Sequence, residues 1–546
     1  MLLVLGTYAP RFLLLRTRTF DPDEFQHLHA TWAVSQGLVP FRDFFEHHMP
    51  AMQLLLAPLM RVYDIAGSAD AMVQFLFVAR TAMAVCAGLA IVLTALLARD
   101  RNGGWSTGFI AAALLGTSVV FLQRSLEIRP DTPSLPLWIA SLALLARAST
   151  TPEPGASRRW FVVAGLCVGG ALAFNQKLLL AGPGLAIWAS VYVRDRASRD
   201  GYLSAMGALV LFGLAAAVPL GVVVVWFAAH GALADLISGT LIGNLGWPRE
   251  VAASSTIRWM ALRDPILSAL MVGGFTFEGL ALWRSRGRAG SAAAWFSGVS
   301  LLALLFVTPT PFPQYMLLIL PIGAWFAARL LVAAAAAIGG DAAPGVPALR
   351  ATLLAAGAGV LALLVPALVV ARPVVVHPAL FPAAVLGALV AALALSRRGM
   401  PQIAVALLLA ATSLYSLQQI RWMQGLSNAE QIASMRALHA QTSPATTVLD
   451  GFSGLAWFRP YASYYGFLHP GVRAHMTSRD TQAVVALLTR CESAPGVVIM
   501  DGNLRALSPT LLQGVERSYR PGTVADTWIL DAATSPLCND AMRRLP

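Results

Sequence analysis

The sequence is divided into roughly thirteen apolar runs, most of them long enough to cross a lipid bilayer. The runs are continuous rather than alternating, which argues against a membrane β-barrel. Helices are predicted, because lipid cannot satisfy unpaired peptide groups. The runs are Met1–Leu15, Val73–Leu97, Trp105–Leu122, Pro133–Leu145, Phe161–Phe174, Leu178–Val193, Leu203–Ala229, Pro265–Trp283, Ala292–Val307, Tyr315–Val332, Ala351–Val370, Leu380–Leu395 and Ile403–Ile420. The predicted fold class is an all-α polytopic transmembrane bundle of about 12–13 spans.

The composition agrees with a membrane protein. Hydrophobic residues make up 57% of the chain and charged residues only 12%, about half the charged share of a soluble domain. The net charge of +12 comes almost entirely from arginine, since Lys177 is the only lysine. A basic chain raises the question of nucleic acid as a partner. The arginines, however, form short clusters between apolar runs, the pattern that orients a membrane protein. We therefore expect membrane lipids as partners, and no nucleic acid.

The arginine-rich loops predict the orientation, because such loops stay in the cytoplasm. The N-terminus is then cytoplasmic, and an odd number of crossings places the residues after 421 outside. A miscount by one span reverses the side of this tail. Three segments face outward: Thr17–Ala71, the turn from Glu127 to Asp131, and Gly231–Asp264. We expect a multi-pass protein of the inner (plasma) membrane whose chemistry lies on the extracytoplasmic face.

Residues 421–546 differ in composition from the rest of the chain. Strand-like runs alternate with helix-like ones, which predicts a small extracytoplasmic α/β domain. The predicted organisation is a transmembrane module at 1–420, with its first outward loop at 17–71, followed by this domain. Cys491 and Cys538 would then lie in an oxidising compartment, where a disulfide between them is a hypothesis.

The acidic stretch from Asp21 to His29 follows the first apolar run. Carboxylates so close to a bilayer are costly unless they are solvated or used. Asp23 is a candidate general base, held near an acceptor hydroxyl. The alternative is a solvated loop that caps a helix, which is a common role for an aspartate before a helical run.

The next motif runs from Gly37 to Pro50 and is rich in aromatic residues. Glu46, His47 and His48 are candidate ligands of a divalent metal or a phosphate. Adjacent histidines seldom share one metal well, and no third ligand follows from the spacing. The simpler interpretation is a set of interfacial histidines, and a divalent metal is left open.

Three further groups lie at the predicted outer ends of apolar runs. Arg129 and Asp131 lie in a charged turn, which could equally be an ion pair that closes a helical hairpin. Lys177 could hold a lipid phosphate as a point charge or extend to the interface. Gln314 and Tyr315, which open another run, are candidate substrate or metal contacts, although tyrosine also suits the aromatic belt.

In their order along the chain, these motifs resemble the polytopic C-type membrane glycosyltransferases, in particular the branch of protein O-mannosyltransferases and the aminoarabinose transferase of lipid A. The likeness covers roughly 20–332. The motifs that carry it are Pro22-Asp23-Glu24, the Gly37–Pro50 stretch with Arg42 and Glu46, Arg129-Pro130-Asp131, Gln176-Lys177, and Gln314-Tyr315 before Pro321.

The resemblance implies an inverting enzyme that takes a sugar from a polyprenyl phosphate donor and transfers it to an envelope lipid, glycan or protein. Asp23 would be the general base, with Glu24 beside it. Asp131 would orient Arg129 or the acceptor. Lys177, Arg129, Arg42 and His48 would bind the donor phosphate. Relatives often have a lysine where this chain has His48, which puts that contact in question.

Two other functions compete with the enzyme. A transporter or flippase of a lipid-linked sugar should show related halves and ionisable residues near the bilayer midplane. The sequence shows no clear halves, and its ionisable residues gather at one face. A non-catalytic scaffold whose tail binds an envelope partner is the third hypothesis.

Overall fold

The computed structural model describes residues 10–99, 105–151, 153–285, 290–338, 425–531 and 535–538, together with scattered residues between 405 and 423. The predicted runs at 351–370 and 380–395 lie outside the described residues, as does the start of the first run. The total number of spans and the predicted orientation therefore stay predictions.

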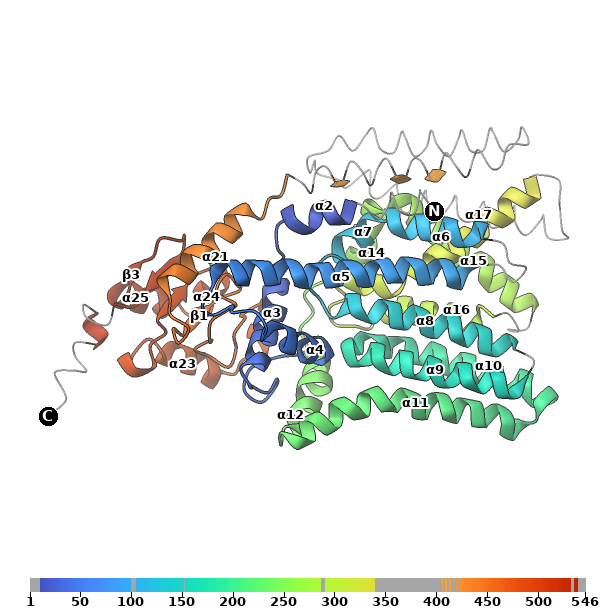
Figure 1. The fold of residues 1–546 in the computed structure, drawn as a ribbon, viewed down its shortest axis with the longest axis horizontal. Coiled ribbons are helices and arrows are strands. Elements are labelled where there is room, and N and C mark those ends of the chain that lie inside the picture. Colours follow the sequence, from blue (N-terminus) through green and yellow to red (C-terminus); the bar gives the residue numbers. More distant parts are fainter. Residues whose placement is uncertain are drawn as a thin grey trace.

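The apolar part of the chain forms a layered bundle of helices (Figure 1). Four helices are long and apolar enough to cross a membrane: α5 (Ala69–Ala98), α9 (Pro154–Phe174), α11 (Tyr202–Ala229) and α15 (Pro265–Arg284). The bundle also contains α2 (Pro10–Thr17), α6 (Ser106–Thr117), α7 (Val119–Arg124), α8 (Asp131–Thr150), α10 (Gly182–Asp200), α14 (Ala253–Arg263), α16 (Ala292–Leu304) and α17 (Leu320–Ile338). The predicted helical, multi-pass membrane fold is confirmed.

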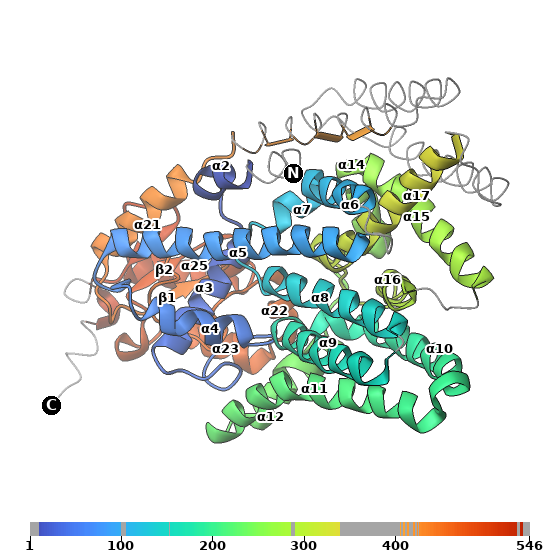
Figure 2. The ribbon, with the colours of Figure 1, turned by 45° about the vertical axis from the view of Figure 1, so that its right-hand side comes forward.

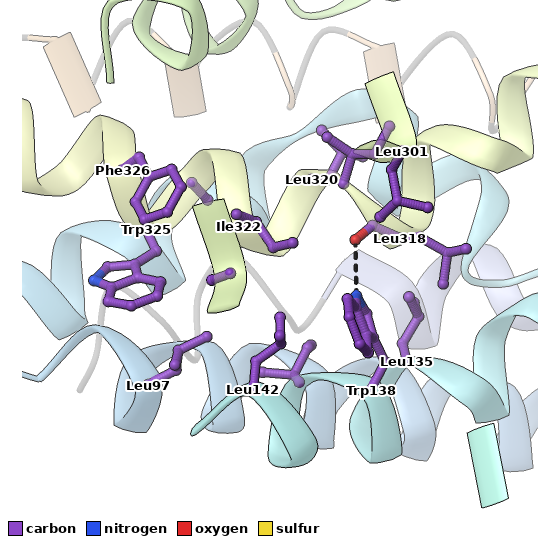
Figure 3. Close-up of a cluster of buried hydrophobic side chains, with 14 of the residues drawn as sticks. Leu97, Leu135, Trp138, Leu142, Leu301, Leu318, Leu320, Ile322, Trp325 and Phe326 are labelled. Atoms are coloured by element: carbon purple, nitrogen blue, oxygen red, sulfur yellow. Dashed lines mark hydrogen bonds between the residues drawn. The ribbon is translucent and has the colours of Figure 1, made fainter. Parts of the chain in front are cut away.

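Side chains of the bundle divide between a packed interior and a lipid-compatible surface. Trp138 on α8 is fully buried and donates an indole hydrogen bond to the Leu318 carbonyl at 3.2 Å. Around it, leucines of α8 and α16 interdigitate with Ile322, Trp325 and Phe326 of α17 (Figure 3). Valines of α11, such as Val222 with 68% exposure, instead point away from the protein. This apolar surface is what contact with lipid tails requires.

One predicted span is interrupted. The run Trp105–Leu122 divides at Ser118 into α6 and α7. Asp264 stabilises the break, because its carboxylate accepts hydrogen bonds from the backbone N–H groups of Val119 and Val120 at 2.7 and 2.8 Å and from the Ser118 hydroxyl at 2.7 Å. The free N–H groups at the start of α7 thereby gain partners.

Residues 17–71, which the sequence places outside the bundle, fold into two short helices, α3 (Pro22–Ser35) and α4 (Ala51–Met60). In Figure 1 these helices lie between the bundle and the C-terminal region, and in Figure 2 they overlap the C-terminal region. Hydrogen bonds hold the loop between these helices to that region, since Phe45 N donates to the Tyr464 carbonyl at 2.9 Å and the Tyr464 hydroxyl donates to the Phe41 carbonyl at 2.6 Å. Residues 17–71 therefore lie against both the bundle and the C-terminal region.

Two further segments lie near the ends of the bundle. After α11 the chain forms α12 (Leu233–Ile237), the π-helical turn η2 (Ser238–Ile242) and α13 (Gly243–Leu245). Two 3₁₀ turns, η1 (Gln176–Ala181) and η3 (Pro313–Leu318), precede α10 and α17. Both turns fall at motifs that the sequence marks as functional.

The C-terminal region is the predicted small α/β unit. Its four strands are β1 (Val448–Asp450), β2 (Val497–Ile499), β3 (Arg520–Pro521) and β4 (Thr527–Ile529), in the order β1-β2-β4-β3. β1 and β2 are parallel, with Leu449 opposite Val498, and β4 is antiparallel to β2. The surrounding helices are α21 (Ala429–Gln441), α22 (Pro470–His475), α23 (Ser478–Ala486), α24 (Gly502–Arg505), α25 (Pro509–Ser518) and the 3₁₀ turn η4 (Cys491–Ser493). The sequence did not predict β3, which has only two residues.

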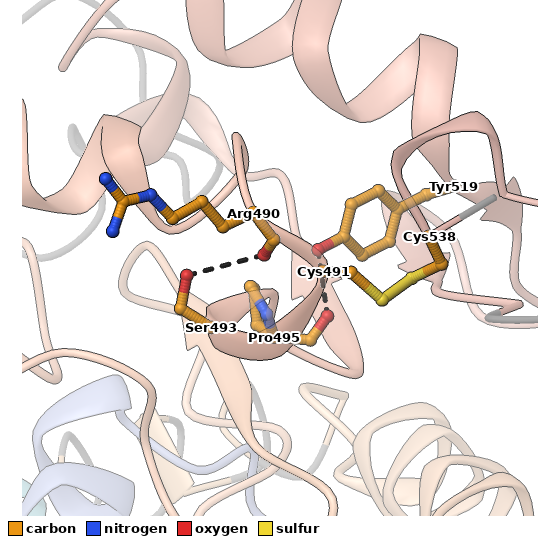
Figure 4. The surroundings of a disulfide bond; sticks show 6 residues. All are labelled: Arg490, Cys491, Ser493, Pro495, Tyr519 and Cys538. Carbon is orange, nitrogen blue, oxygen red and sulfur yellow. Dashed lines mark hydrogen bonds between the residues drawn. A yellow bond between two sulfur atoms is a disulfide. The ribbon is translucent and has the colours of Figure 1, made fainter. Parts of the chain in front are cut away.

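Cys491 and Cys538 form a disulfide, with their Cα atoms 4.8 Å apart (Figure 4). Beside it, the Tyr519 hydroxyl donates to the Pro495 carbonyl at 2.9 Å. The bond ties the end of the described chain to the segment before β2.

Candidate functional site

The acidic motif begins a helix. Asp21 is the N-cap of α3, where its Oδ1 accepts from the Asp23 N–H at 3.1 Å, and its own N–H donates to Glu24 Oε1 at 3.0 Å. This reciprocal arrangement is a capping box, so the capping alternative is correct for Asp21. The positive end of the helix dipole also favours carboxylates in this turn. Asp23 therefore projects from a rigid helix start, with 27% of its side chain exposed.

Glu24 has a different environment from its neighbour. Its side chain is fully buried, and Arg80 on α5 donates to both of its oxygens, at 2.6 and 2.9 Å. The Ile128 N–H also donates to Oε2 at 3.2 Å. This geometry does not support the predicted catalytic role of Glu24, because both oxygens are already occupied. Glu24 instead joins α3 to α5.

Arg129 is the closest cation to Asp23. Its Nη2 lies 2.6 Å from Asp23 Oδ2 and 3.2 Å from Asp21 Oδ1, while its Nε lies 2.6 Å from Glu127 Oε2. The Arg129 side chain is only 4% exposed. The charged turn therefore does more than form a local ion pair that closes a helical hairpin, because Arg129 also contacts Asp21 and Asp23 at the start of α3.

Glu127 is the centre of a buried arginine–carboxylate cluster, which consists of Asp21, Asp23, Glu127, Arg18, Arg124 and Arg129. Arg18 and Arg124 donate to Glu127 at 2.8 and 3.0 Å, in addition to the bond from Arg129. Three carboxylates therefore balance three guanidinium groups. Without this balance, so many buried charges would be strongly unfavourable.

The charges of this cluster shift the pKa values of its acids in opposite directions. Burial is the largest single influence and raises the pKa of Asp23, but Arg129 together with His27 and His48 outweighs burial and lowers that pKa to about 2. Burial raises the pKa of Asp21 to about 6, and the nearby Glu127 and Asp23 carboxylates add to this increase. Asp23 is therefore the carboxylate that stays ionised at the exposed edge of the cluster.

A second ion pair involves Asp131, two residues after Arg129, and Lys177. Lys177 Nζ donates to Asp131 Oδ1 at 2.9 Å and to Oδ2 at 3.2 Å, and the Asn175 amide donates to the same Oδ1 at 2.9 Å. The ammonium also lies 4.9 Å from the centre of the Tyr315 ring, within cation–π range. Asp131 is 1% exposed and Lys177 11% exposed, so the lysine is the accessible partner.

The loop before α4 contains the predicted metal or phosphate motif. Glu46 is buried, and its Oε1 accepts from the N–H groups of His47 and His48 at 2.8 and 3.0 Å and from His48 Nδ1 at 2.9 Å. His47 stacks on Trp247 instead, with ring centres 4.7 Å apart. Gln176 joins this loop to the lysine turn, because its amide donates to the His47 carbonyl at 2.6 Å.

The remaining predicted residues divide into two groups. Arg42 pairs with the adjacent Asp43 at 2.8 Å and donates to the His230 carbonyl at 2.7 Å, so it does not join the other cations. Gln314 is buried in η3, beside Tyr315. The structure thus brings together Asp23, Arg129, Asp131, Lys177 and Tyr315, but not Arg42.

Several contributors were not predicted from the sequence. They are Asp21, His27, Arg18, Arg124, Glu127 as the cluster centre, and Asn175. His27 carried one usable signal, since it follows Asp23 by four residues and such residues share a helix face. Arg18 carried no signal, because its partner Glu127 lies more than a hundred residues away, whereas Arg124 lies only three residues before Glu127.

Comparisons with known proteins agree with this picture of the fold. Residues 57–226 match the family model of dolichyl-phosphate-mannose-protein mannosyltransferase. Two crystal structures of ArnT from Cupriavidus metallidurans are similar over 97% of both chains: the apo state at 15% identity and a TM-score of 0.63, and the complex with undecaprenyl phosphate at 14% and 0.62. No curated protein sequence matches significantly. The predicted resemblance to the C-type membrane glycosyltransferases is confirmed at the level of fold.

Proposed function

We propose that this chain, which has the fold of a C-type membrane glycosyltransferase, transfers a sugar from a polyprenyl phosphate to an envelope acceptor. The acceptor is a lipid, glycan or protein on the extracytoplasmic face of the inner membrane. One observation carries the proposal: a partly exposed carboxylate, Asp23, and two cations, Arg129 and Lys177, belong to two ion pairs whose charges all act on His48 between them. The similar ArnT structure that holds undecaprenyl phosphate supports this class of donor.

The reaction is a single displacement at the anomeric carbon. The acceptor hydroxyl oxygen bonds to this carbon on the face opposite the phosphate, and its proton passes to a carboxylate oxygen of Asp23. The bond between the carbon and the phosphate oxygen breaks, and its electron pair leaves with the polyprenyl phosphate. The configuration at the carbon is therefore inverted.

The two cations stabilise the charge that develops on the departing phosphate. Lys177 is held by Asp131 before the donor binds, at 2.9 Å, and a phosphate can replace part of that contact. Arg129 uses Nε and Nη2 for carboxylates in the described part of the chain. Its Nη1 takes part in none of these bonds, and we assign it to the phosphate.

A deletion strain tests the proposal. We expect a polyprenyl-linked sugar to accumulate and one sugar to be missing from an envelope glycan or lipid, as measured by mass spectrometry. A plasmid copy of the wild type should restore both profiles, whereas Asp23→Asn should not, at equal amounts in the membrane. Asp70→Asn is the matched control, because Asp70 is an exposed carboxylate at the start of α5.

An assay in detergent separates a transferase from a flippase. In micelles there is no bilayer to cross, so only a transferase forms the glycosylated product from purified donor and acceptor. Unchanged lipid profiles in the deletion strain, or full complementation by Asp23→Asn, would contradict the proposed reaction.

A further inference from the structure

Three potential metal ligands converge beside Asp23. His27 lies in the second turn of α3, and Glu46 and His48 lie in the loop before α4. Each offers one ligand atom, and these atoms lie within 4.8 Å of one another. His27 is 1% and Glu46 2% exposed, and the His48 side chain is 13% exposed. His27 and Glu46 are 19 residues apart in the sequence. The fold thus brings two separate segments together in one group of ligands.

His27 is the member that local packing does not explain. Its Nδ1 is buried and has no hydrogen-bond partner among the described residues. Its ring meets the His48 ring edge-on, with the centres 4.7 Å apart. A buried polar atom without a partner is costly, and a group bound at this position would satisfy it.

Glu46 is held in place by groups around it. The N–H groups of His47 and His48 donate to Oε1 at 2.8 and 3.0 Å, and the Gln53 amide donates to Oε2 at 3.1 Å. Such outer contacts orient the ligands of metal sites. The alternative is a simple hydrogen bond from His48 Nδ1 to Glu46, at 2.9 Å. That bond accounts for His48 but leaves His27 without a partner.

We propose that His27, Glu46 and His48 bind a divalent transition metal ion, with Zn²⁺ as the best fit. Two imidazoles with one carboxylate suit zinc, whereas magnesium and calcium prefer oxygen ligands. The sequence predicted Glu46, His47 and His48 as the candidate ligands. In the structure His27 takes the place of His47, because His47 stacks on Trp247 and its ring does not belong to the converging group. Three protein ligands leave a fourth position open, as in catalytic zinc sites.

The position of the site suggests its use, and this part rests on the proposed function. His27 follows Asp23 by one helical turn, so the ion would lie beside the carboxylate that receives the acceptor proton. An open position there fits an oxygen of the acceptor or of the donor phosphate. Binding of the ion itself can be measured without sugar transfer, so the two proposals can fail separately.

The test uses the full-length protein, purified in detergent and treated with a chelator. It is titrated with Zn²⁺ alone by calorimetry, and with Co²⁺, whose visible absorption reports coordination. We expect one equivalent to bind, and to raise the unfolding temperature, since a ligand of the folded state stabilises it. His27→Gln and His48→Gln should each weaken binding by at least about tenfold.

His47→Gln is the matched control, since it changes the neighbouring histidine and should keep the wild-type metal affinity. Size-exclusion profiles without metal show whether each variant is folded, and Glu46→Gln replaces any histidine variant that is not. The proposal is overturned if the wild type binds no stoichiometric Zn²⁺. It is equally overturned if His27→Gln and His48→Gln bind the ion as tightly as the wild type.

Discussion

The ammonium of Lys177, the only lysine in the sequence, lies 2.9 Å from the carboxylate of Asp131 and 4.9 Å from the centre of the Tyr315 ring. Asp131 is the first residue of α8, so the pair is attached to a rigid helix end. A compact charge that is already paired, and still partly exposed, can exchange its partner for a phosphate. Under the proposed function, this relationship gives the lysine a phosphate contact that arginine, with its broad planar group, would not reproduce.

Replacing Lys177 tests the phosphate contact. We expect Lys177→Met to lower kcat/KM for sugar transfer by about 100-fold, because one donor to the developing charge is lost. Lys177→Arg should recover part of this loss, since it keeps the charge but changes the shape. The measurement is product formation in detergent. Wild-type activity in Lys177→Met would exclude Lys177 from the reaction.

Replacing Asp23 and Glu24 one at a time distinguishes the roles of these two adjacent acids. Asp23→Asn should still fold, with some loss of stability because Arg129 loses a partner, and should lose transfer activity by a factor of about 100 to 10,000, the contribution of a general base. Glu24→Gln should unfold at a lower temperature, because the buried Arg80 loses its charged partner. Its activity per folded molecule should stay near the wild type. The opposite pattern, with Glu24→Gln folded and inactive, would reverse the two roles.

Glu127→Gln tests the arginine–carboxylate cluster. The change leaves the buried Arg18 and Arg129 and the partly buried Arg124 with one carboxylate fewer, and we expect a loss of about 3–5 kcal/mol in the free energy of unfolding. Thermal unfolding in detergent measures this loss. Glu516→Gln, at an exposed position of α25, is the control and should unfold with the wild type. Equal stability of the two variants would contradict the assigned role of Glu127.

The pH dependence follows from the pKa of Asp23. Burial raises this pKa, but Arg129, with His27 and His48, lowers it to about 2. Since this value lies below the ordinary one, the ionised form is favoured in the folded protein. Its stabilising contribution is complete above about pH 4 and is lost as the pH falls towards 2. Transfer should therefore show no decline above about pH 4 that depends on Asp23.

The matched variant for pH dependence is Arg129→Gln, which removes the main cause of the low pKa of Asp23. Burial then dominates, and the residual activity should decline at a higher pH than in the wild type. The measurement is kcat/KM against pH for both proteins, after a folding check by size exclusion. Superimposable profiles would show that Arg129 does not control the ionisation of Asp23.

The disulfide between Cys491 and Cys538 is testable on gels. The oxidised protein should change mobility on reduction, and alkylation should label these thiols only after reduction. Replacing either cysteine by serine should cost about 2–5 kcal/mol in stability. Cys86→Ser is the control, since that cysteine is unpaired. Unchanged mobility, with both thiols freely alkylated, would show that the bond does not form in the membrane-bound protein.

Much of the architecture could be predicted because it depends on local sequence. A run of about 20 apolar residues must be helical in lipid, whatever surrounds it. The start of α3 could also be predicted from the sequence, since Asp21 and Glu24 form a capping box within four residues. The order of the motifs along the chain likewise predicted the fold.

Tertiary structure decided the rest, because ion pairs and ligand sets join residues that are distant in sequence. Nothing in the local sequence distinguishes Asp23 from Glu24; the distinction comes from Arg80, 56 residues from Glu24, which neutralises one acid and leaves the other exposed. His27 likewise meets Glu46 and His48 only after α3 and the following loop have packed together. Propensity and hydrophobicity act along the chain, whereas charge pairing and metal ligation depend on distance in space.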